Sequence, residues 1–174
     1  MKGKIFNAQE VQAIIAGTKT MFREVIKTQT KTNEPLNLAY TTPYRTWEWG
    51  NSGVYVEEPY EVGQKIFCKE AFALRDKDGK YFQFRPFKAY KADAESDFAQ
   101  WKLAQHMKQE HSRLTLEITD IKVERLKDVS NADCRSEGED QWSFICNWDA
   151  THKKPEEKFE ANPFVWVVDF KINK

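Results

Sequence analysis

The chain has few cysteines, glycines and prolines, and it has no long hydrophobic run. Its three cysteines, Cys68, Cys134 and Cys146, are widely separated, which argues against a disulfide framework or a zinc ribbon and fits a reducing cytosol. No stretch of about eighteen apolar residues occurs, and no apolar run follows the opening lysines, so we expect neither a membrane span nor a signal peptide. The sequence therefore predicts a soluble, cytoplasmic protein.

Net charge is also absent, because 27 basic residues balance 27 acidic ones. A protein that coats nucleic acid non-specifically has a basic excess, so nucleic-acid binding here would need a local patch. Of the three histidines, His106 and His111 are five residues apart, a spacing that does not place two metal ligands on one helical face. No glycine-rich phosphate loop and no G-x-S-x-G motif occurs. We therefore expect no metal and no cofactor.

Aromatic residues are plentiful, at 14% of the chain. Together with the length, they favour one packed domain over residues 1–174. Within it we expect a loop-rich insertion at about 28–54 and an excursion at about 88–111, where a helix could include Phe98, Trp101 and Gln105. Trp47 and Trp49 lie in the insertion, on a loop from Tyr44 to Trp49 or on a short edge strand. These tryptophans could stack on bases if exposed, or belong to the core if buried.

A short helix is predicted near the N-terminus. Asn7 is a good N-cap, and Glu10 stands three residues later, so the two can form a capping box. Val11, Ile14 and Ile15 form an apolar stripe, and Gly17 ends the helix.

Three polar residues, Lys19, Thr20 and Arg23, follow this helix where a strand begins. They are the first candidates for a binding site. The alternative for Lys19 is structural, because the helix dipole favours a cation near a helix C-terminus by roughly 0.3 to 1 kcal/mol.

Residues 65–74 and 81–87 are predicted to form a β-hairpin around the Asp78-Gly79 turn. Glu70 lies among apolar residues of the first strand, where a carboxylate needs a partner or a face open to water. Residues 113–126 alternate as a strand does, but the phase slips near Thr119 and Asp120, which predicts a β-bulge. Residues 164–172 are apolar on both faces, which is typical of a strand inside a sheet.

A second capped helix is predicted from Ser130, with Asp133 in the capping box and Gly138 at its end. Glu137 lies in its last turn, where the helix dipole disfavours an anion. This position suggests a role elsewhere, although a solvated surface glutamate is the simpler alternative. A third helical segment follows at residues 141–149, and we expect Trp142, Ile145, Cys146 and Trp148 in the core.

Four stretches of the sequence resemble one known family. AGTKTMFREVIK resembles the GxKxxT-type signature of the ASCH domain, a PUA-like β-barrel family, in the version carried by small phage and prophage proteins. PYEVGQKIFCKEAF is similar to the PY-x-x-G-x-x-x-x-x-x-E-x-F segment of that group. LTLEITDIKVERLKDVSNADCRSEG resembles its long strand and following helix, and EANPFVWVVDF resembles its closing strand.

The resemblance implies an α+β fold, a PUA-like β-barrel with flanking short helices, and a cleft for RNA or a modified nucleoside. Some ASCH proteins deacetylate acetylcytidine with a Lys, a Thr and a Glu, and others are reported as ribonucleases. By motif, the lysine corresponds to Lys19 and the glutamate to Glu137, while the threonine position corresponds to Phe22. Phe22 has no hydroxyl, so Thr20 would have to substitute, and Glu24 stands where phage relatives usually have a basic residue.

Three functions follow as hypotheses. The first is RNA or nucleotide binding by a phage or prophage accessory protein in RNA processing or regulation, in a cleft lined by Lys19, Thr20, Arg23, Glu70 and Glu137, with Trp47 or Trp49 stacking on a base. Under this hypothesis Lys19→Ala weakens RNA binding without unfolding the protein. The second is an amidohydrolase for N-acylated pyrimidine nucleosides, with Lys19 and Glu137 as the acid and base, or else a ribonuclease. The third is a protein-interaction module, which a large exposed apolar patch would favour.

Overall fold

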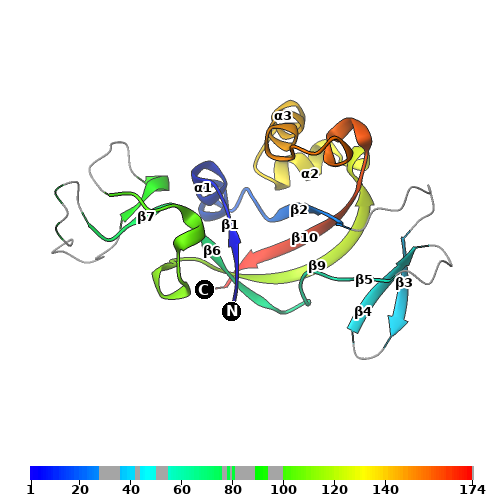
Figure 1. Ribbon diagram of the computed structural model, residues 1–174, viewed down its shortest axis with the longest axis horizontal. Coiled ribbons are helices and arrows are strands. Elements are labelled where there is room, and N and C mark those ends of the chain that lie inside the picture. The colour runs from blue at the N-terminus through cyan, green and yellow to red at the C-terminus, as the bar shows by residue number, and fades with distance from the viewer. Residues whose placement is uncertain are drawn as a thin grey trace.

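The computed structural model of this chain describes residues 1–27, 36–41, 44–49, 55–75, 78, 80, 89–93 and 100–173. Its secondary structure is mixed α+β, as predicted, and a five-stranded sheet forms its centre (Figure 1). The strand order is β1-β6-β9-β10-β2; β1 and β6 are parallel, and the other neighbours are antiparallel. These strands are β1 (Lys2–Ile5), β2 (Met21–Val25), β6 (Lys65–Lys69), β9 (Thr115–Arg125) and β10 (Phe164–Ile172).

Strand β10 lies between β9 and β2, and both of its faces are buried, which confirms the prediction for residues 164–172. One face packs into a core that also contains Phe6 and Phe22, and the other packs into a core with Met21, Cys134, Phe144 and Trp148. The predicted bulge is confirmed too. Asp169 pairs with Asp120, and Phe170 pairs with Ile118, so Thr119 is the extra residue of β9.

The two edges of the central sheet, β1 and β2, approach each other through side chains. Lys4 Nζ lies 2.5 Å from Glu24 Oε1 and 4.5 Å from the centroid of the Phe22 ring. The Phe6 and Phe22 rings also meet edge to face, with centroids 5.9 Å apart. Among the described residues, however, no backbone pairing joins β1 to β2, so the sheet is not closed into a barrel by a hydrogen-bonded ladder.

Three α-helices cover the central sheet, and they pack into its two different cores (Figure 1). The first contributes Val11 and Ile14 to the core that contains Phe6 and Phe22, and the other two contribute to the core that contains Met21. The first has the predicted capping box between Asn7 and Glu10 and ends at Gly17, whose φ of 76° is left-handed. Its apolar stripe is narrower than predicted, since Ile15 is exposed. The second has the predicted capping box between Ser130 and Asp133. The helices are α1 (Ala8–Ala16), α2 (Asn131–Ser136) and α3 (Gln141–Thr151).

Only part of the core predicted for helix α3 is correct. Phe144, which was not predicted, is buried. Trp148 is buried and Ile145 is half-buried against the same core, but Trp142 is 75% exposed and Cys146 is exposed. The reason is that α3 rests on the sheet with one face, and Trp142 and Cys146 lie on the other. Among the described residues, no helix has both the length and the apolar character to cross a membrane.

The predicted insertion contains regular strands. A three-stranded antiparallel sheet has the order β3-β4-β5, so Tyr44–Trp49 is the central strand of this sheet and neither a loop nor an edge. Its other strands are β3 (Leu36–Thr41) and β5 (Tyr55–Glu57). Residues 28–35, 42–43 and 50–54 lie outside the described part of the chain.

At the other end of the molecule, β7 (Phe72–Ala73) pairs with β8 (Ala89–Tyr90), while the predicted hairpin partner at 81–87 lies outside the described residues. No α-helix includes Trp101 and Gln105, and Phe98 is not described. The reason is that Lys102 and Phe72 exchange backbone hydrogen bonds of 2.7 and 3.2 Å, which hold this segment extended. Single 3-10 turns occur at η1 (Lys91–Asp93), η2 (Ala104–His106), η3 (Gln109–His111), η4 (Leu126–Asp128), η5 (Pro155–Glu157) and η6 (Phe159–Ala161).

Candidate functional site

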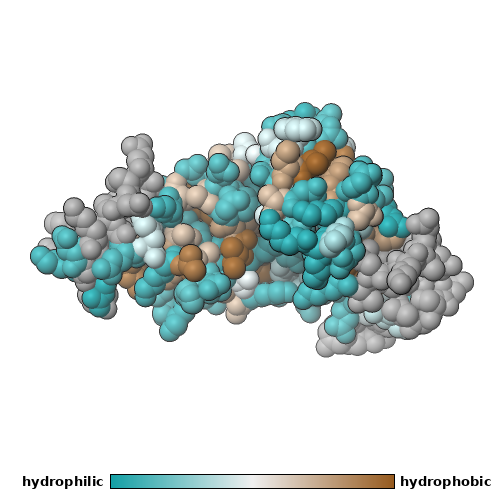
Figure 2. Space-filling model, turned by 45° about the horizontal axis from the view of Figure 1, so that its top comes forward, coloured by the Kyte–Doolittle hydropathy of each residue, from teal (hydrophilic) through white to brown (hydrophobic). Residues whose placement is uncertain are grey.

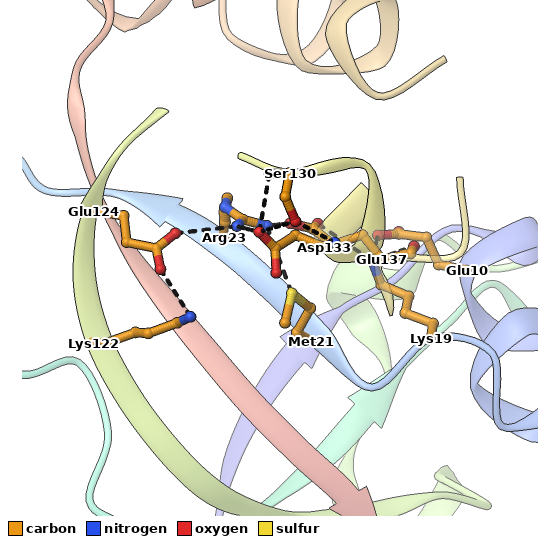
Figure 3. Close-up of polar contacts among 9 residues, drawn as sticks. All are labelled: Glu10, Lys19, Met21, Arg23, Lys122, Glu124, Ser130, Asp133 and Glu137. Atoms are coloured by element: carbon orange, nitrogen blue, oxygen red, sulfur yellow. Dashed lines mark hydrogen bonds and ion pairs between the residues drawn. The ribbon is translucent and has the colours of Figure 1, made fainter. Parts of the chain in front are cut away.

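The C-terminal ends of α1 and α2 meet, and this contact places Lys19 beside Glu137 (Figure 3). The two residues form an isolated antiparallel β-bridge, in which the Thr20 amide donates to the Ser136 carbonyl at 2.7 Å. Both helices end at a glycine with positive φ, 76° at Gly17 and 83° at Gly138. Because each glycine reverses the chain sharply, the residue beside it can reach the other helix end.

The side chain of Lys19 points into this junction. Its Nζ donates a hydrogen bond of 3.0 Å to the backbone carbonyl of Glu137, and it lies 3.7 Å from Oε2 of the same residue. It also lies 3.4 Å from Glu10 Oε1. Lys19 is only 3% exposed and Glu137 only 8%. A buried lysine therefore faces two carboxylates from two different helices.

Arg23 approaches Glu137 from the other side. Its Nη1 donates to Glu137 Oε1 at 2.5 Å. Its Nη2 lies 3.3 Å from Glu124 Oε2 and 3.5 Å from Asp133 Oδ2. The Arg23 side chain is completely buried. The carboxylates of Glu124, Asp133 and Glu137 therefore all contact a guanidinium that solvent does not reach. Figure 3 shows this sequence of contacts from Glu124 through Arg23 to Glu137 and Lys19.

Burial and charge act on Glu137 in opposite directions. Burial raises the pKa of the Glu137 carboxyl above its ordinary value, and the positive charges of Lys19 and Arg23 offset part of this effect. For Asp133, burial also acts to raise the pKa, but the hydrogen bonds from Ser130 and the charge of Arg23 outweigh it and lower the pKa. A carboxyl group with a raised pKa, next to a lysine, is the combination that acid/base catalysis uses.

A hollow of about 510 Å³ opens onto this pair, between β1, β2, α1 and α3. We call it the Lys19 hollow. Its aromatic wall includes Trp148, whose ring stacks on His152 with centroids 4.0 Å apart. The charged side chains that line it are the cations Lys4, Lys19, Arg23 and Lys27 and the carboxylates Glu10, Glu24, Glu137, Glu139 and Glu157.

A second hollow, of about 740 Å³, adjoins the same helix junction and is lined by residues of α1, α2 and α3. Glu10, Glu137, Glu139 and Asn147 line both hollows, so the acidic member of the pair faces each of them. Most of the other residues that line the second hollow have polar or charged side chains: Gln9, Thr18, Asn131, Arg135, Asp140, Gln141 and Ser143.

The structure brings together Lys19, Arg23 and Glu137 but not the other predicted site residues. Glu70 is buried in a separate cluster, where Arg113 binds its two carboxylate oxygens at 2.8 and 2.9 Å. Trp47 packs edge to face on Trp166 and donates from Nε1 to Glu58 at 2.9 Å. Neither residue lines the Lys19 hollow.

Two other positions named from the sequence, Thr20 and Phe22, do not supply a catalytic group to the Lys19 hollow. Thr20 is exposed and does not line the hollow, so its hydroxyl is not placed to substitute for the one that Phe22 lacks. Phe22 lines the hollow and also packs in the main core. The side chain of Trp49 lies outside the part of the structure that is described.

Sequence reasoning missed three contributors to the site: Glu10, Glu124 and Asp133. Glu10 and Asp133 were recognised only as capping residues, although each also faces a buried cation. No local pattern marks Glu124, which reaches Arg23 across the sheet. In the described residues, no group of three or more His, Cys, Asp or Glu side chains is arranged to hold a metal ion.

No family model matches this chain, and no curated protein matches it. Among solved structures, the crystal structure of protein EF3133 from Enterococcus faecalis, described with the family model DUF984, matches 99% of this chain and 80% of its own. The two sequences are 10% identical and the TM-score is 0.47, so the likeness is distant.

Proposed function

We propose that this chain is an ASCH domain with a PUA-like fold. The four motifs that resemble the family occur in the family's order, and they contribute β2, β6, β9 with α2, and β10. The side-chain contacts of Lys4 with Glu24 and Phe22 bring the edges of the central sheet together, as a barrel with an open seam requires.

Within that fold, we propose that the Lys19 hollow binds an N-acylated pyrimidine nucleoside and hydrolyses its amide bond. One observation carries the proposal: Lys19 and Glu137, which the resemblance pairs as catalytic residues, are both almost completely buried and line the same hollow. A lysine and a carboxyl group that serve only as a surface ion pair have no need of such burial.

The chemistry requires only water and these two side chains. Glu137, as a carboxylate, takes a proton from water through Oε2, and the water oxygen bonds to the acyl carbon. Lys19 donates a hydrogen bond to the oxyanion that forms. The carbon–nitrogen bond then breaks, and Glu137 returns the proton to the departing amine. The products are a carboxylic acid and the free amino nucleoside.

The geometry favours this function over phosphate binding by Lys19 and Arg23. Both cations are buried and already face carboxylates, and in the Lys19 hollow the carboxylates outnumber the cations. A phosphate backbone would meet this negative charge before it reached either cation. RNA binding through Lys19 and Arg23 is therefore the weaker of the two hypotheses.

A protein-interaction role has less support on the face that Figure 2 shows, where hydrophilic residues dominate and hydrophobic ones form separate small spots. The exposed large apolar side chains of the described residues belong to different elements: Met1, Ile5, Ile15, Tyr55, Val62, Leu103 and Trp142.

The test is to incubate the purified protein with acetylcytidine and measure the release of cytidine. We expect turnover by the wild type and a loss of about 10²- to 10⁴-fold in kcat for Glu137→Gln, because the general base is removed. The matched control is Glu160→Gln, which neutralises an exposed carboxylate outside both hollows and should leave turnover unchanged. No turnover by the wild type, or equal turnover by Glu137→Gln, would overturn the proposal.

A further inference from the structure

We propose that Arg23 is a positioning residue: its guanidinium fixes the orientation of the Glu137 carboxylate so that Oε2 is the oxygen that exchanges the proton. This inference rests on the proposed function, because it assigns a task to Glu137 as the base. The sequence had placed Arg23 in the lining of an RNA-binding cleft, but its side chain is completely buried and its terminal nitrogens already contact protein groups.

The contact geometry separates the two oxygens of Glu137. Arg23 Nη1 holds Oε1 at 2.5 Å, while the nearest cation to Oε2 is Lys19 Nζ at 3.7 Å. A hydrogen bond to a charged donor is strong and directional at the shorter distance, and much weaker at the longer one. Oε1 is therefore occupied, and Oε2 is the oxygen left to accept a proton beside Lys19.

Arg23 is itself held by two other elements. Its Nη2 lies 3.3 Å from Glu124 Oε2 on β9 and 3.5 Å from Asp133 Oδ2 on α2. Asp133 is fixed in turn, because it accepts hydrogen bonds from both the amide and the hydroxyl of Ser130. The planar guanidinium thus connects β2, β9 and the start of α2 to the catalytic carboxylate. A lysine at this position would have one nitrogen and could not span these partners.

One polar atom of Arg23 remains without a partner. Its Nε is buried and has no hydrogen-bond acceptor among the described residues. Buried polar groups in proteins are nearly always paired, and an exception in a rigid charged network often marks a functional constraint. Nη1 and Nη2 contact carboxylates while Nε has no partner. This arrangement is consistent with a role of Arg23 in orienting the Glu137 carboxylate.

Arg23 also sets the charge that Glu137 experiences. The groups facing Glu137 are Lys19 and Arg23, which favour its ionised form, and Glu139, which disfavours it. Glu10 and Asp133 face the two cations rather than Glu137. Removing the charge of Arg23 leaves burial opposed by Lys19 alone, so the pKa of Glu137 rises further.

The experiment compares Arg23→Lys with Arg23→Met. Arg23→Lys keeps the positive charge but loses the two terminal nitrogens of the guanidinium. We expect its kcat to fall about tenfold to a hundredfold with KM unchanged. The acidic limb of its profile of kcat against pH should stay near the wild-type position. For Arg23→Met, the acidic limb should move to higher pH. The carboxyl resonance of Glu137, followed by carbon NMR, should titrate at higher pH in Arg23→Met than in the wild type, whether or not the protein turns over substrate.

The controls separate a structural effect from a positioning effect. Arg113→Lys weakens an Arg–Glu pair whose glutamate is buried away from the hollow and should leave the pH profile and the Glu137 titration unchanged. If Arg23→Met does not fold, Glu124→Gln removes one anchor of Arg23 and should lower kcat in the same direction. Wild-type kcat in Arg23→Lys, or an unchanged Glu137 titration in Arg23→Met, overturns this inference. Absence of wild-type turnover instead overturns the proposed function, and the two failures are thus distinguishable.

Discussion

Lys19 and Glu137 are 118 residues apart, yet they are joined twice: their backbones form a β-bridge, and the Lys19 ammonium donates to the Glu137 carbonyl. The backbone contact and the side-chain contact together hold the buried pair in place. The bridge joins the C-terminal ends of α1 and α2. A change in the packing of these two helices would therefore separate Lys19 from Glu137.

The first prediction concerns Lys19. Because it is 3% exposed, Lys19→Met should lower the free energy of unfolding by about 3 kcal/mol, the cost of breaking a buried ion pair. Urea denaturation would measure this. The same measurement on Lys19→Ala tests the expectation from sequence that this change does not unfold the protein. Lys65→Met, at an exposed position on β6, should change stability by less than about 0.5 kcal/mol; equal effects at the two sites would contradict the prediction.

The second prediction concerns pH. The pKa of Glu137 is raised above its ordinary value of 4.5, so the folded state binds this proton more tightly than the unfolded state does. Rising pH then removes stability, starting from 4.5 and continuing through the raised folded value. The free energy of unfolding of Glu137→Gln should fall less steeply over this window than that of the wild type. Urea denaturation at several pH values would show it, and parallel curves would refute it.

The third prediction applies the same reasoning to Asp133, with the opposite sign. Its pKa is lowered from 3.8, because the hydrogen bonds from Ser130 and the charge of Arg23 outweigh burial. Its contribution to stability is therefore complete above pH 3.8 and is lost as pH falls through the lower folded value. Asp133→Asn should lose less stability than the wild type upon acidification below 3.8. An unchanged acid dependence would contradict this.

The fourth prediction tests the glycine that ends α2. An alanine Cβ at Gly138 would lie 3.0 Å from the Ala13 Cβ, at a φ of 83°. Gly138→Ala should therefore cost more than the strain of about 1 to 2 kcal/mol expected for a left-handed alanine, and it should reduce turnover by separating α2 from α1. Gly63→Ala is the matched control, since Gly63 has a φ of 86° and nothing within 4 Å of the added Cβ.

The fifth prediction concerns Glu70, which the sequence placed in the site. Arg113→Met would leave this carboxylate, 1% exposed, without its bidentate partner. We expect a loss of about 3 to 5 kcal/mol in the free energy of unfolding, with unchanged turnover per folded molecule. Reduced turnover by molecules shown to be folded would return Glu70 to the site.

The sequence alone predicted much of the local structure, because the relevant residues are close together in the chain. The capping boxes at Asn7 and Ser130, the glycine ends of α1 and α2, and the bulge at Thr119 each depend on neighbours within a few positions. Long hydrophobic patterns, such as that of β10, also determined which strands lie inside the sheet. The helix expected near Trp101 was wrong, since a distant partner, Phe72, holds that segment extended.

The tertiary structure decided which charges are buried and with whom. Nothing near Arg23 in the sequence indicates that Glu124, Asp133 and Glu137 surround it, and nothing near Glu70 indicates that Arg113 removes it from the site. Capping and periodicity act over a few residues, whereas the burial of a charge depends on every element packed around it. The sequence thus determined the helix ends that carry Lys19 and Glu137, and only the packing of those ends determined that the two residues share one hollow.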